Sequence, residues 1–238
     1  MKLNNEIWAF IPARSGSKSI KDKNITILKN KPLLAHSLLV AKNCKMVDKI
    51  IFSSDSEKYF NIAKNYTNFF FHKRKKSISL DMSTDFDVFY DFVKNFKGVL
   101  PKFFVHLRPT TPFRNSKILD VVIAQFLKKQ KKYSSLRSLS LMTNPVYKSV
   151  IIKNNKLYSP IYKSFSGDKI NSPRQNYLKS YMSNGYIDII KTKSILAGFL
   201  HGTQVMPYVN TDFVSDIDSL FDLKIASYLN CAIKKNDK

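Results

Sequence analysis

Residues 13–18, with the sequence Ala-Arg-Ser-Gly-Ser-Lys, are the first segment of this chain whose side chains could do chemistry. They follow the continuous apolar run of residues 7–12, which is typical of a buried parallel strand. Open α/β sheets bind ligands at the carboxyl ends of such strands, and this loop offers backbone amides, two hydroxyls and two cations to phosphate oxygens. The spacing G-x-x-x-x-G-K-[ST] is absent, which disfavours a P-loop NTPase mechanism. Taken alone, the segment is either a phosphate-binding loop or an ordinary strand-to-helix turn.

A pair of carboxylates, Asp216 and Asp218, stands near the end of the sequence with Ile217 between them. In an extended segment this alternation turns both carboxylates to one face and the apolar residue into the core. Two hard oxygen ligands on one face suit Mg²⁺, which proteins bind through one or two carboxylates together with substrate phosphates. The same residues also fit a helix N-terminus, with Asp218 as the cap and Asp222 in the first turn. Both interpretations are compatible with the spacing.

The formal charge of +23 would first suggest a polyanionic partner such as nucleic acid. However, 34 of the 40 basic residues are Lys and Asn is abundant, a pattern that AT-rich coding produces without selection for a ligand. The charge clusters at 73–76 and 128–132 are typical of solvated surface. Arginine is more informative, because its planar bidentate fork is hard to replace. The six arginines are therefore the first candidates for anion binding: Arg14, Arg74, Arg108, Arg114, Arg137 and Arg174.

The chain alternates between predicted strands and predicted helices. Its hydrophobic patterns indicate strands at residues 7–12, 49–53, 68–71, 103–107, 135–141 and 185–190, and helices at residues 32–44, 56–66, 83–96, 116–130 and 219–232. This β-α-β alternation predicts an α/β sandwich with a mostly parallel sheet. With 44% hydrophobic and 24% charged residues, the 238 residues suit one domain that spans residues 1–238.

From about residue 143 to residue 181 the pattern changes to short β-like pieces. They are broken by Asn154, Asn155, Pro160, Gly167 and Pro173, and no helix of useful length fits between them. We expect an inserted lobe at residues 143–181. Because such pieces contain too little core to stand alone, we expect the lobe to form the interface of a homodimer.

Several other classes of protein do not fit the sequence. No apolar run approaches the roughly 20 residues that span a bilayer, and the first apolar run lacks the length and cleavage site of a signal peptide. Cys44 and Cys231 match no metal spacing and no disulfide framework. We therefore expect a cytoplasmic protein without a membrane partner. The histidines are interpreted as core or surface residues without a catalytic partner, except that His106 stands at a strand end beside the predicted cleft.

Three blocks of sequence match one known family. Residues 11–25, Ile-Pro-Ala-Arg-Ser-Gly-Ser-Lys-Ser-Ile-Lys-Asp-Lys-Asn-Ile, resemble the opening signature of the acylneuraminate (CMP-sialic acid) cytidylyltransferase family. Residues 107–114 resemble its Gln/Arg-Pro-Thr-Ser-Pro-Leu-Arg motif, and residues 216–222 resemble its terminal Asp-Ile-Asp motif. Weaker matches lie between them, at Arg74 with Leu80-Asp81, at residues 173–175 and at residues 184–187. The blocks follow the family's order over nearly the whole chain.

The resemblance implies a Rossmann-like three-layer sandwich with a dimerising insertion, and a transferase reaction. In that reaction the anomeric hydroxyl of a nine-carbon 2-keto sugar acid attacks the α-phosphorus of CTP and releases pyrophosphate. A displacement of this kind mainly needs charge neutralisation and alignment. The implied cofactor is Mg²⁺, and the implied partners are CTP, an anionic sugar acid and a second copy of the chain, with no specific nucleic acid.

The resemblance also implies roles for individual residues. The nucleotide-binding residues would be Ala13, Arg14, Ser17, Lys23, Asn24, Arg74 and Ser83. The catalytic residues would be Arg14, Lys23, Asp216 and Asp218, of which the two aspartates would also bind the metal. The sugar acid would meet Arg108, Arg174, Tyr181 and Asn184. Arg174 would hold its carboxylate, because a guanidinium binds a carboxylate through two parallel hydrogen bonds.

This sequence departs from the family's common pattern at three positions. Asp85 replaces a serine found in several relatives, Arg108 replaces a common glutamine, and Met182 stands where relatives that bind sialic acid often carry an arginine. A different nonulosonic acid, or a 2-keto-3-deoxy acid, is therefore an open alternative. A related enzyme for 3-deoxy-manno-octulosonic acid has a different opening loop. A nucleic-acid-binding protein, the alternative from another class, would carry its cations in a stripe with interleaved aromatics.

Overall fold

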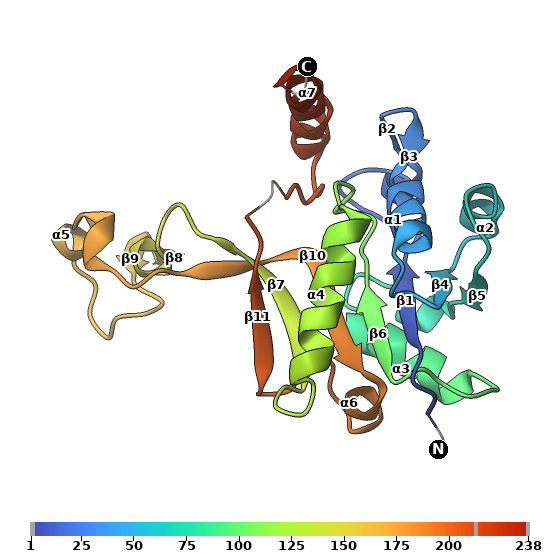
Figure 1. The fold of residues 1–238 in the computed structure, drawn as a ribbon. Helices are drawn as coiled ribbons and strands as arrows, with labels where there is room; N and C mark the ends of the chain where they lie inside the picture. Colours follow the sequence, from blue (N-terminus) through green and yellow to red (C-terminus); the bar gives the residue numbers. More distant parts are fainter. Residues whose placement is uncertain (1–2, 212–213, 237–238) are drawn as a thin grey trace.

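The computed structural model describes residues 3–211 and 214–236. Within these residues the centre is a seven-stranded sheet in the order β11-β7-β10-β6-β1-β4-β5 (Figure 1). The strands are β1 (Ile7–Pro12), β4 (Lys49–Ser54), β5 (Phe70–Lys73), β6 (Phe103–His106), β7 (Ser135–Leu141), β10 (Tyr181–Lys191) and β11 (Val205–Val209). Strand β10 is antiparallel to both neighbours, and the other neighbouring pairs are parallel. The predicted α/β fold with a mostly parallel sheet is confirmed.

Helices cover both faces of the sheet and make three layers. Along β1, Ile7, Ala9 and Ile11 face one core, and Trp8 and Phe10 face the other. The first core packs against α1 (Leu33–Asn43), α2 (Glu57–Ala63) and α4 (Ser116–Lys129), and the second against α3 (Asp85–Asn95) and α6 (Thr192–Leu196). Burial on both faces explains why β1 reads as an unbroken apolar run.

Some elements differ from the sequence prediction. The strand expected at residues 68–71 is β5, two residues later, because His72 and Lys73 pair with Ser53 and Ser54 of β4. The short elements α6 and β11 were not predicted. Pro207 lies inside β11, and proline is tolerated there because β11 is an edge strand. The last helix, α7 (Leu220–Asn236), contacts the small hairpin of β2 (Ile27–Leu28) and β3 (Lys31–Pro32).

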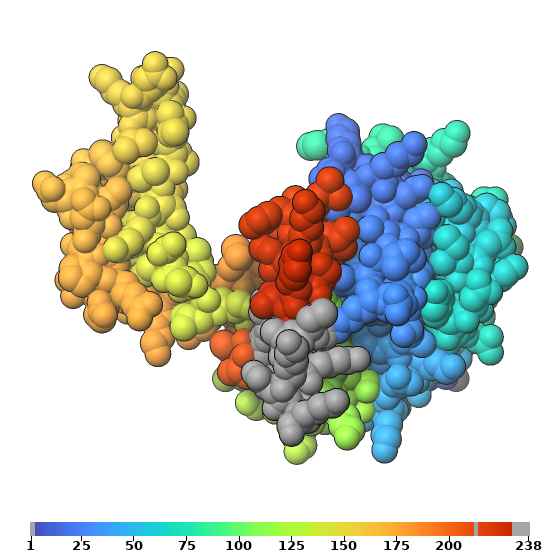
Figure 2. Space-filling view, turned by 90° about the horizontal axis from the view of Figure 1, so that it is seen from above, coloured from blue at the N-terminus to red at the C-terminus, as the bar shows by residue number. Residues whose placement is uncertain are grey.

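The segment between β7 and β10 leaves the sheet and projects from the body of the molecule (Figures 1 and 2). Its base is closed by a hydrogen bond from the Met142 amide to the Ser180 carbonyl, 2.9 Å long, next to the predicted boundaries at 143 and 181. The segment contains the hairpin of β8 (Ile151–Lys153) and β9 (Lys156–Tyr158) and the one-turn helix α5 (Gly167–Ile170). Asn154 and Asn155 both adopt positive φ at the hairpin turn, as a two-residue turn requires.

Candidate active site

The loop after β1 is fixed from below by the end of β4. The Ala13 amide donates to the Ser53 carbonyl at 2.8 Å, and the Ala13 side chain is fully buried. The Ser15 amide and hydroxyl donate to the two carboxylate oxygens of Asp55, each at 2.8 Å. The bonds of Ala13 to Ser53 and of Ser15 to Asp55 therefore fix the conformation of the loop. Ala13, which was predicted to bind nucleotide, does not line the cleft, because its amide and side chain are used inside the fold.

A cleft of about 220 Å³ lies at the carboxyl end of β1. It gathers residues that are far apart in the sequence, from the first loop, from the end of β5, from the start of α3 and from the segment after β6. Its lining contains six of the seven predicted nucleotide-binding residues, namely Arg14, Ser17, Lys23, Asn24, Arg74 and Ser83, and also Thr84, Asp85, Val88 and Arg108. Four cations therefore meet in one concavity, which is an arrangement suited to a polyphosphate.

Two of these cations are held by exposed carboxylates. Arg14 lies 2.9 Å from Asp81, which also binds Lys18 at 2.5 Å. Lys23 lies 3.0 Å from Asp218. Exposed pairs of this kind contribute little to stability, so a phosphate oxygen can replace the carboxylate at small cost. The cations are thus already oriented and still available to a ligand.

Arg74 lies at the inner wall of the cleft. Arg74 is the first residue after β5, is 8% exposed and lines the cleft. Its Nε donates to the Ser53 hydroxyl at 2.9 Å. Burial lowers the pKa of Arg74 to about 10, and Asp55 and Asp85 partly oppose this shift. The guanidinium is still charged at neutral pH, and its direction is set by the serine.

Arg108 is clamped between two carboxylates. Its Nη2 donates to Asp85 at 2.7 Å and its Nη1 donates to Asp188 at 3.0 Å. Burial opposes the charge on Arg108, but Asp85 and Asp188 outweigh it and raise the pKa of the guanidinium. The two departures from the family pattern at positions 85 and 108 therefore face each other as an ion pair. Arg108 lines the cleft, and two carboxylates of the chain already compensate its charge.

His106 lies beneath this pair. The ring is fully buried, with Nε2 3.9 Å from Asp85, and burial lowers the pKa of His106 to about 3. It is not among the residues that line the cleft. A neutral, enclosed imidazole cannot exchange protons with a substrate, so His106 does not act as a general base here.

Asp216 and Asp218 flank Ile217 as the alternation predicts. Ile217 is fully buried, its amide donates to the Thr110 carbonyl at 2.8 Å, and both aspartates are exposed. The helix cap is formed by other residues: the Ser219 hydroxyl accepts from the Asp222 amide at 3.2 Å, and Asp222 accepts from the Ser219 amide at 2.7 Å. Neither Asp216 nor Asp218 is used as the cap.

The structure allows a test of whether these two carboxylates fit a magnesium ion. Asp218 is 74% exposed beside Lys23 of the cleft, and Thr110, which anchors the segment, lines the same cleft. Within residues 3–211 and 214–236 there is no group of three or more potential protein ligands. Mg²⁺ does not need one, because it binds through one or two carboxylates while phosphates and water complete its shell. The donor set fits the ion in the presence of a nucleotide.

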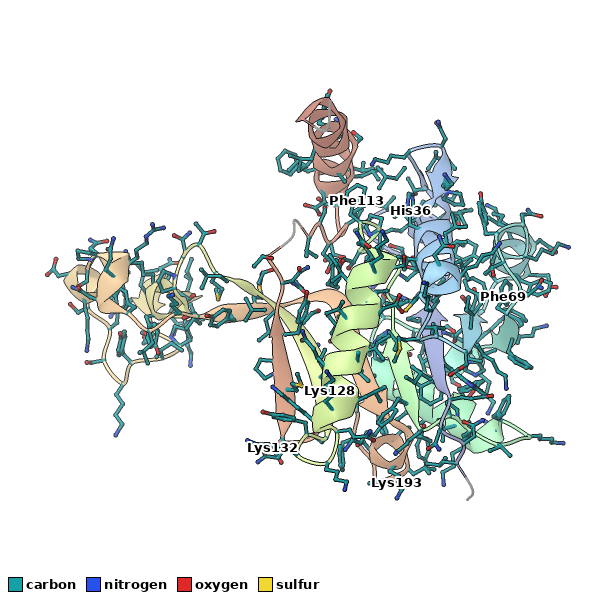
Figure 3. The ribbon with its side chains drawn as sticks, in the orientation of Figure 1. His36, Phe69, Phe113, Lys128, Lys132 and Lys193 are labelled. Atoms are coloured by element: carbon teal, nitrogen blue, oxygen red, sulfur yellow. The ribbon has the colours of Figure 1, made fainter. Side chains whose placement is uncertain are left out.

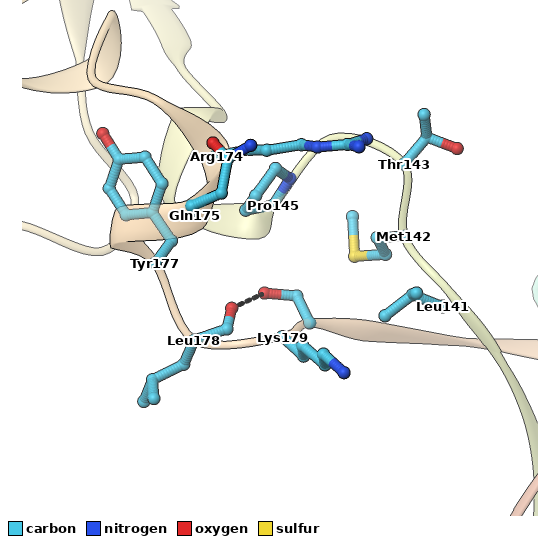
Figure 4. A pocket seen from close by; sticks show the side chains of 10 residues that line it. Leu141, Met142, Thr143, Pro145, Arg174, Gln175, Tyr177, Leu178 and Lys179 are labelled. Atoms are coloured by element: carbon cyan, nitrogen blue, oxygen red, sulfur yellow. Dashed lines mark hydrogen bonds between the residues drawn. The ribbon is translucent and has the colours of Figure 1, made fainter.

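The predicted sugar-binding residues are not brought together within one chain. Arg174 lies in the projecting lobe, where it lines a separate pocket of about 580 Å³ with Met142, Pro145 and Tyr177 (Figure 4). Tyr181 is exposed at the start of β10. Asn184 is used inside the fold: its Nδ2 donates to Ser140 and its Oδ1 accepts from the Tyr186 amide. None of Arg174, Tyr181 and Asn184 lines the cleft beside Arg108.

The last arginine of the block at residues 107–114 has a structural role. Arg114 donates to the carbonyl oxygens of Tyr186 at 2.6 Å, Gly185 at 2.8 Å and Arg108 at 2.9 Å. It thereby ties the segment after β6 to β10. Gly185 is needed at this junction, because its φ is +67° and a Cβ there would lie 3.0 Å from the Thr111 hydroxyl.

Sequence reasoning missed the residues that act from behind the cleft. Asp55, Asp188 and Ser53 belong to no short motif, and each contacts a cleft segment from a neighbouring strand or its end. The lysines of residues 128–132 line a depression with Lys102 and are absent from the cleft lining. Figure 3 shows Lys128, Lys132 and Lys193 at the other end of the molecule from α7. Within the described residues, no helix is both long enough and apolar enough to cross a bilayer.

Comparison with known proteins gives a consistent family. A family model described as cytidylyltransferase matches residues 8–180. The chain is 31% identical over 229 residues to an N-acylneuraminate cytidylyltransferase of Escherichia coli O18:K1:H7 (strain RS218 / NMEC), over 94% of this chain and 52% of that protein. It is 28% identical over 225 residues to a pseudaminic acid cytidylyltransferase of Campylobacter jejuni subsp. jejuni serotype O:23/36 (strain 81-176), over 92% of this chain and 94% of that protein.

A solved structure of a CMP:2-keto-3-deoxy-manno-octonic acid synthetase complexed with CTP has the same fold. The TM-score is 0.66 over 95% of this chain and 99% of that chain, with 10% sequence identity. Fold and family together define a nucleotidyltransferase. The chain belongs to the cytidylyltransferase family, because the family model matches well over half of it. It spans about half the length of the Escherichia coli relative and nearly the whole length of the Campylobacter one.

Proposed function

We propose that this chain transfers the cytidylyl group of CTP to a nonulosonic acid and releases pyrophosphate. The anomeric oxygen of the sugar acid forms a bond to the α-phosphorus, and the bond from that phosphorus to the oxygen shared with the β-phosphorus breaks. The electron pair of the broken bond leaves with pyrophosphate, and the hydroxyl proton passes to solvent. The observation that carries the proposal is the convergence of Arg14 and Lys23, from the loop after β1, with Arg74, from the end of β5, on one cleft. The names of both relatives support CTP and a sugar acid as substrates.

The cations of the cleft would perform the main chemical task. A triphosphate attacked at its α-phosphorus gains negative charge on the leaving pyrophosphate, and preorganised positive groups stabilise that charge without reorganisation. Arg14 and Lys23 would exchange their carboxylate partners, Asp81 and Asp218, for phosphate oxygens. Ser17 and Asn24 would position the nucleotide beside them, because both line the same cleft.

We also propose Mg²⁺ as the cofactor, held by Asp216 and Asp218. When bound, the ion would supply Lewis-acid charge neutralisation for the phosphates. Its two carboxylates stand on an extended segment whose Ile217 is anchored to Thr110, so their position relative to the cleft is fixed by the core. Release of Asp218 from Lys23 would free one ligand for the metal and one cation for the nucleotide at the same time.

The sugar-binding half of the site would be completed by a second copy of the chain. Arg174 and Tyr181 do not line the cleft of their own chain, and the lobe exposes apolar side chains, among them Ile152 and Leu178. Burial of such residues against another subunit is favourable. We propose a homodimer in which the lobe of each chain brings Arg174 toward the sugar acid at the partner's cleft.

Pyrophosphate release tests the function directly. The purified chain is incubated with CTP and Mg²⁺ and with N-acetylneuraminic acid, pseudaminic acid or 3-deoxy-manno-octulosonic acid in turn. We expect turnover with one of the two nonulosonic acids. Turnover with the octulosonic acid alone would replace the proposed sugar class, and salt-sensitive binding of DNA without turnover on any sugar acid would overturn the proposal. UTP in place of CTP is the control for the nucleotide.

The metal and sugar roles are tested by substitution. Asp218→Ala should lower turnover at least about 10²-fold, the effect of losing one preorganised electrostatic contact. The matched control is Glu57→Ala, because Glu57 is an exposed carboxylate of α2. Near-normal turnover of Asp218→Ala at low magnesium would contradict the metal role.

Arg174→Lys should raise the KM for the sugar acid and leave the KM for CTP nearly intact, because lysine cannot form a bidentate pair with a carboxylate.

A further inference from the structure

A chain of hydrogen bonds runs from the wall of the cleft to Asp91 in the middle of α3. The Arg74 Nε donates to the Ser53 hydroxyl oxygen at 2.9 Å. The same oxygen lies 2.9 Å from Nδ1 of His72, and Nε2 of His72 lies 3.0 Å from a carboxylate oxygen of Asp91. Ser53 and His72 are paired residues of the neighbouring strands β4 and β5, so their side chains share one face of the sheet.

The two ends of this chain fix the direction of their own bonds, and the bond between Ser53 and His72 then depends on whether His72 is neutral. A guanidinium N–H can only donate, so Arg74 occupies a lone pair of the Ser53 oxygen. The serine proton is then free to be donated to Nδ1 of His72, which accepts it in the unprotonated state. At the far end the Asp91 carboxylate can only accept, which requires a proton on Nε2. A neutral His72 therefore carries its single proton on Nε2 and accepts from Ser53 at Nδ1.

The surroundings of His72 favour this neutral form. Its side chain is 9% exposed and packs against Phe10 of β1 and Phe92 of α3. Burial lowers the pKa of His72, and the positive charges of Arg74 and Lys75 after β5 add to that effect, whereas Asp91 of α3 opposes it. The facing residue of β4, Ser53, is uncharged.

Asp91 is itself immobilised. One of its oxygens accepts from Lys75 at 2.9 Å and from Asn95 at 2.9 Å, and the other accepts from His72. The far end of the hydrogen-bond chain is therefore anchored to the middle of α3, whose first turn lines the cleft through Asp85 and Val88. The anchor and the cleft wall belong to one rigid element.

We propose that His72 is a positioning residue for nucleotide binding, which in its neutral, Nε2-protonated form holds the Ser53 hydroxyl so that Arg74 is aimed into the cleft. This inference rests on the proposed function only for the identity of the ligand. Loss of the acceptor at Nδ1 leaves the Ser53 rotamer unlocked, and Arg74 then keeps its charge but loses its fixed direction. A second proton on His72 would bring a positive charge to the oxygen that already receives the guanidinium.

Two isosteric replacements separate this role from simple packing. In His72→Asn the amide oxygen replaces Nδ1 and can still accept from Ser53, whereas in His72→Gln the amide nitrogen replaces Nε2 and only the bond to Asp91 is retained. Both variants lose the same ring contacts. We expect the KM for CTP of His72→Gln to exceed that of His72→Asn by about tenfold, the upper end of the scale for one hydrogen bond between neutral groups. The KM for the sugar acid should differ little between them.

Equal KM values for CTP in the two variants would overturn the proposal, because a packing role predicts equal losses. A larger loss in His72→Asn than in His72→Gln would place the function in the Asp91 bond instead and would also overturn it. Ser53→Ala removes the hydroxyl that contacts both Arg74 and His72, and it should raise the KM for CTP at least as much as His72→Gln does. The kcat at saturating CTP should change less than the KM in all three variants, since the contact acts on binding.

A measurement on the unaltered protein decides the point independently of catalysis. Nitrogen-15 chemical shifts of the His72 ring in the ligand-free protein should show the Nε2-protonated tautomer at neutral pH, and the Nδ1-protonated tautomer would refute the inference. If that tautomer is found but no variant or wild-type protein binds CTP, the proposed nucleotide is wrong while the positioning of Arg74 stands. Below pH 6.5, the KM for CTP of the wild type should rise relative to His72→Asn, a ratio that cancels the titration of CTP itself.

Discussion

Arg108 pairs with two carboxylates, and replacing it with glutamine should destabilise the protein because the buried one, Asp188, loses its partner cation. Asp188 is 1% exposed and lies 3.0 Å from Arg108, and its other oxygen is 3.7 Å from Arg137, too far for a hydrogen bond. Removing the cation takes away the hydrogen-bonded partner of a buried charge and leaves only the more distant Arg137, which costs about 3 kcal/mol, the lower end of the range for a broken buried pair. The side chain of Asp85 is 39% exposed, so solvent screens it and its pair with Arg108 contributes about 1 kcal/mol or less. The buried partner therefore determines the loss.

Double-mutant cycles separate the two pairs. Arg108→Gln should cost about 3 kcal/mol or more, and Arg108→Gln with Asp188→Asn should recover about 2 kcal/mol of that loss, because the uncompensated charge is gone. Asp85→Ser should cost about 1 kcal/mol or less and should not rescue Arg108→Gln. Urea unfolding at pH 7.5, followed by circular dichroism, measures each variant. A double variant with Asp188→Asn that is no more stable than Arg108→Gln alone would refute the reasoning, as would equal rescue by Asp85→Ser.

Three further predictions concern stability and assembly. Burial lowers the pKa of His106 to about 3, so as the pH is lowered the unfolded state binds the proton before the folded state does. The free energy of unfolding should therefore fall by up to about 1.4 kcal/mol for each pH unit from pH 6.5 down to pH 3. Urea unfolding across this range should show a shallower slope in His106→Gln; an unchanged slope would contradict the prediction. Arg114→Lys should cost about 3 kcal/mol in the same assay, because lysine cannot reach the carbonyls of Tyr186, Gly185 and Arg108 together, and a loss below about 1 kcal/mol would show that they need no arginine. Sedimentation should show a dimer at micromolar concentration, and a fully active monomer would exclude the proposed shared site.

The sequence alone determined the parts of the fold that depend on local pattern. The apolar run at residues 7–12 predicted β1, because a strand covered on both faces has no polar side. The alternation of Asp216, Ile217 and Asp218 predicted which side chain enters the core. Motif resemblance then predicted most of the cleft lining, since residues that contact the same small ligand occur at characteristic spacings in short loops.

Only the tertiary structure decided how distant segments meet. Arg108 was predicted to meet the sugar acid, but its charge is compensated by Asp85 and Asp188, which are 23 and 80 residues away in the sequence. The chain makes a long excursion through the lobe after β7, and β10 then returns antiparallel to β7 and carries Asp188 to that position. The same excursion separates Arg174 from the cleft. Local propensity contains no information on such contacts, because they depend on which strands pair and in which register, and the burial energy of the whole sheet selects that arrangement.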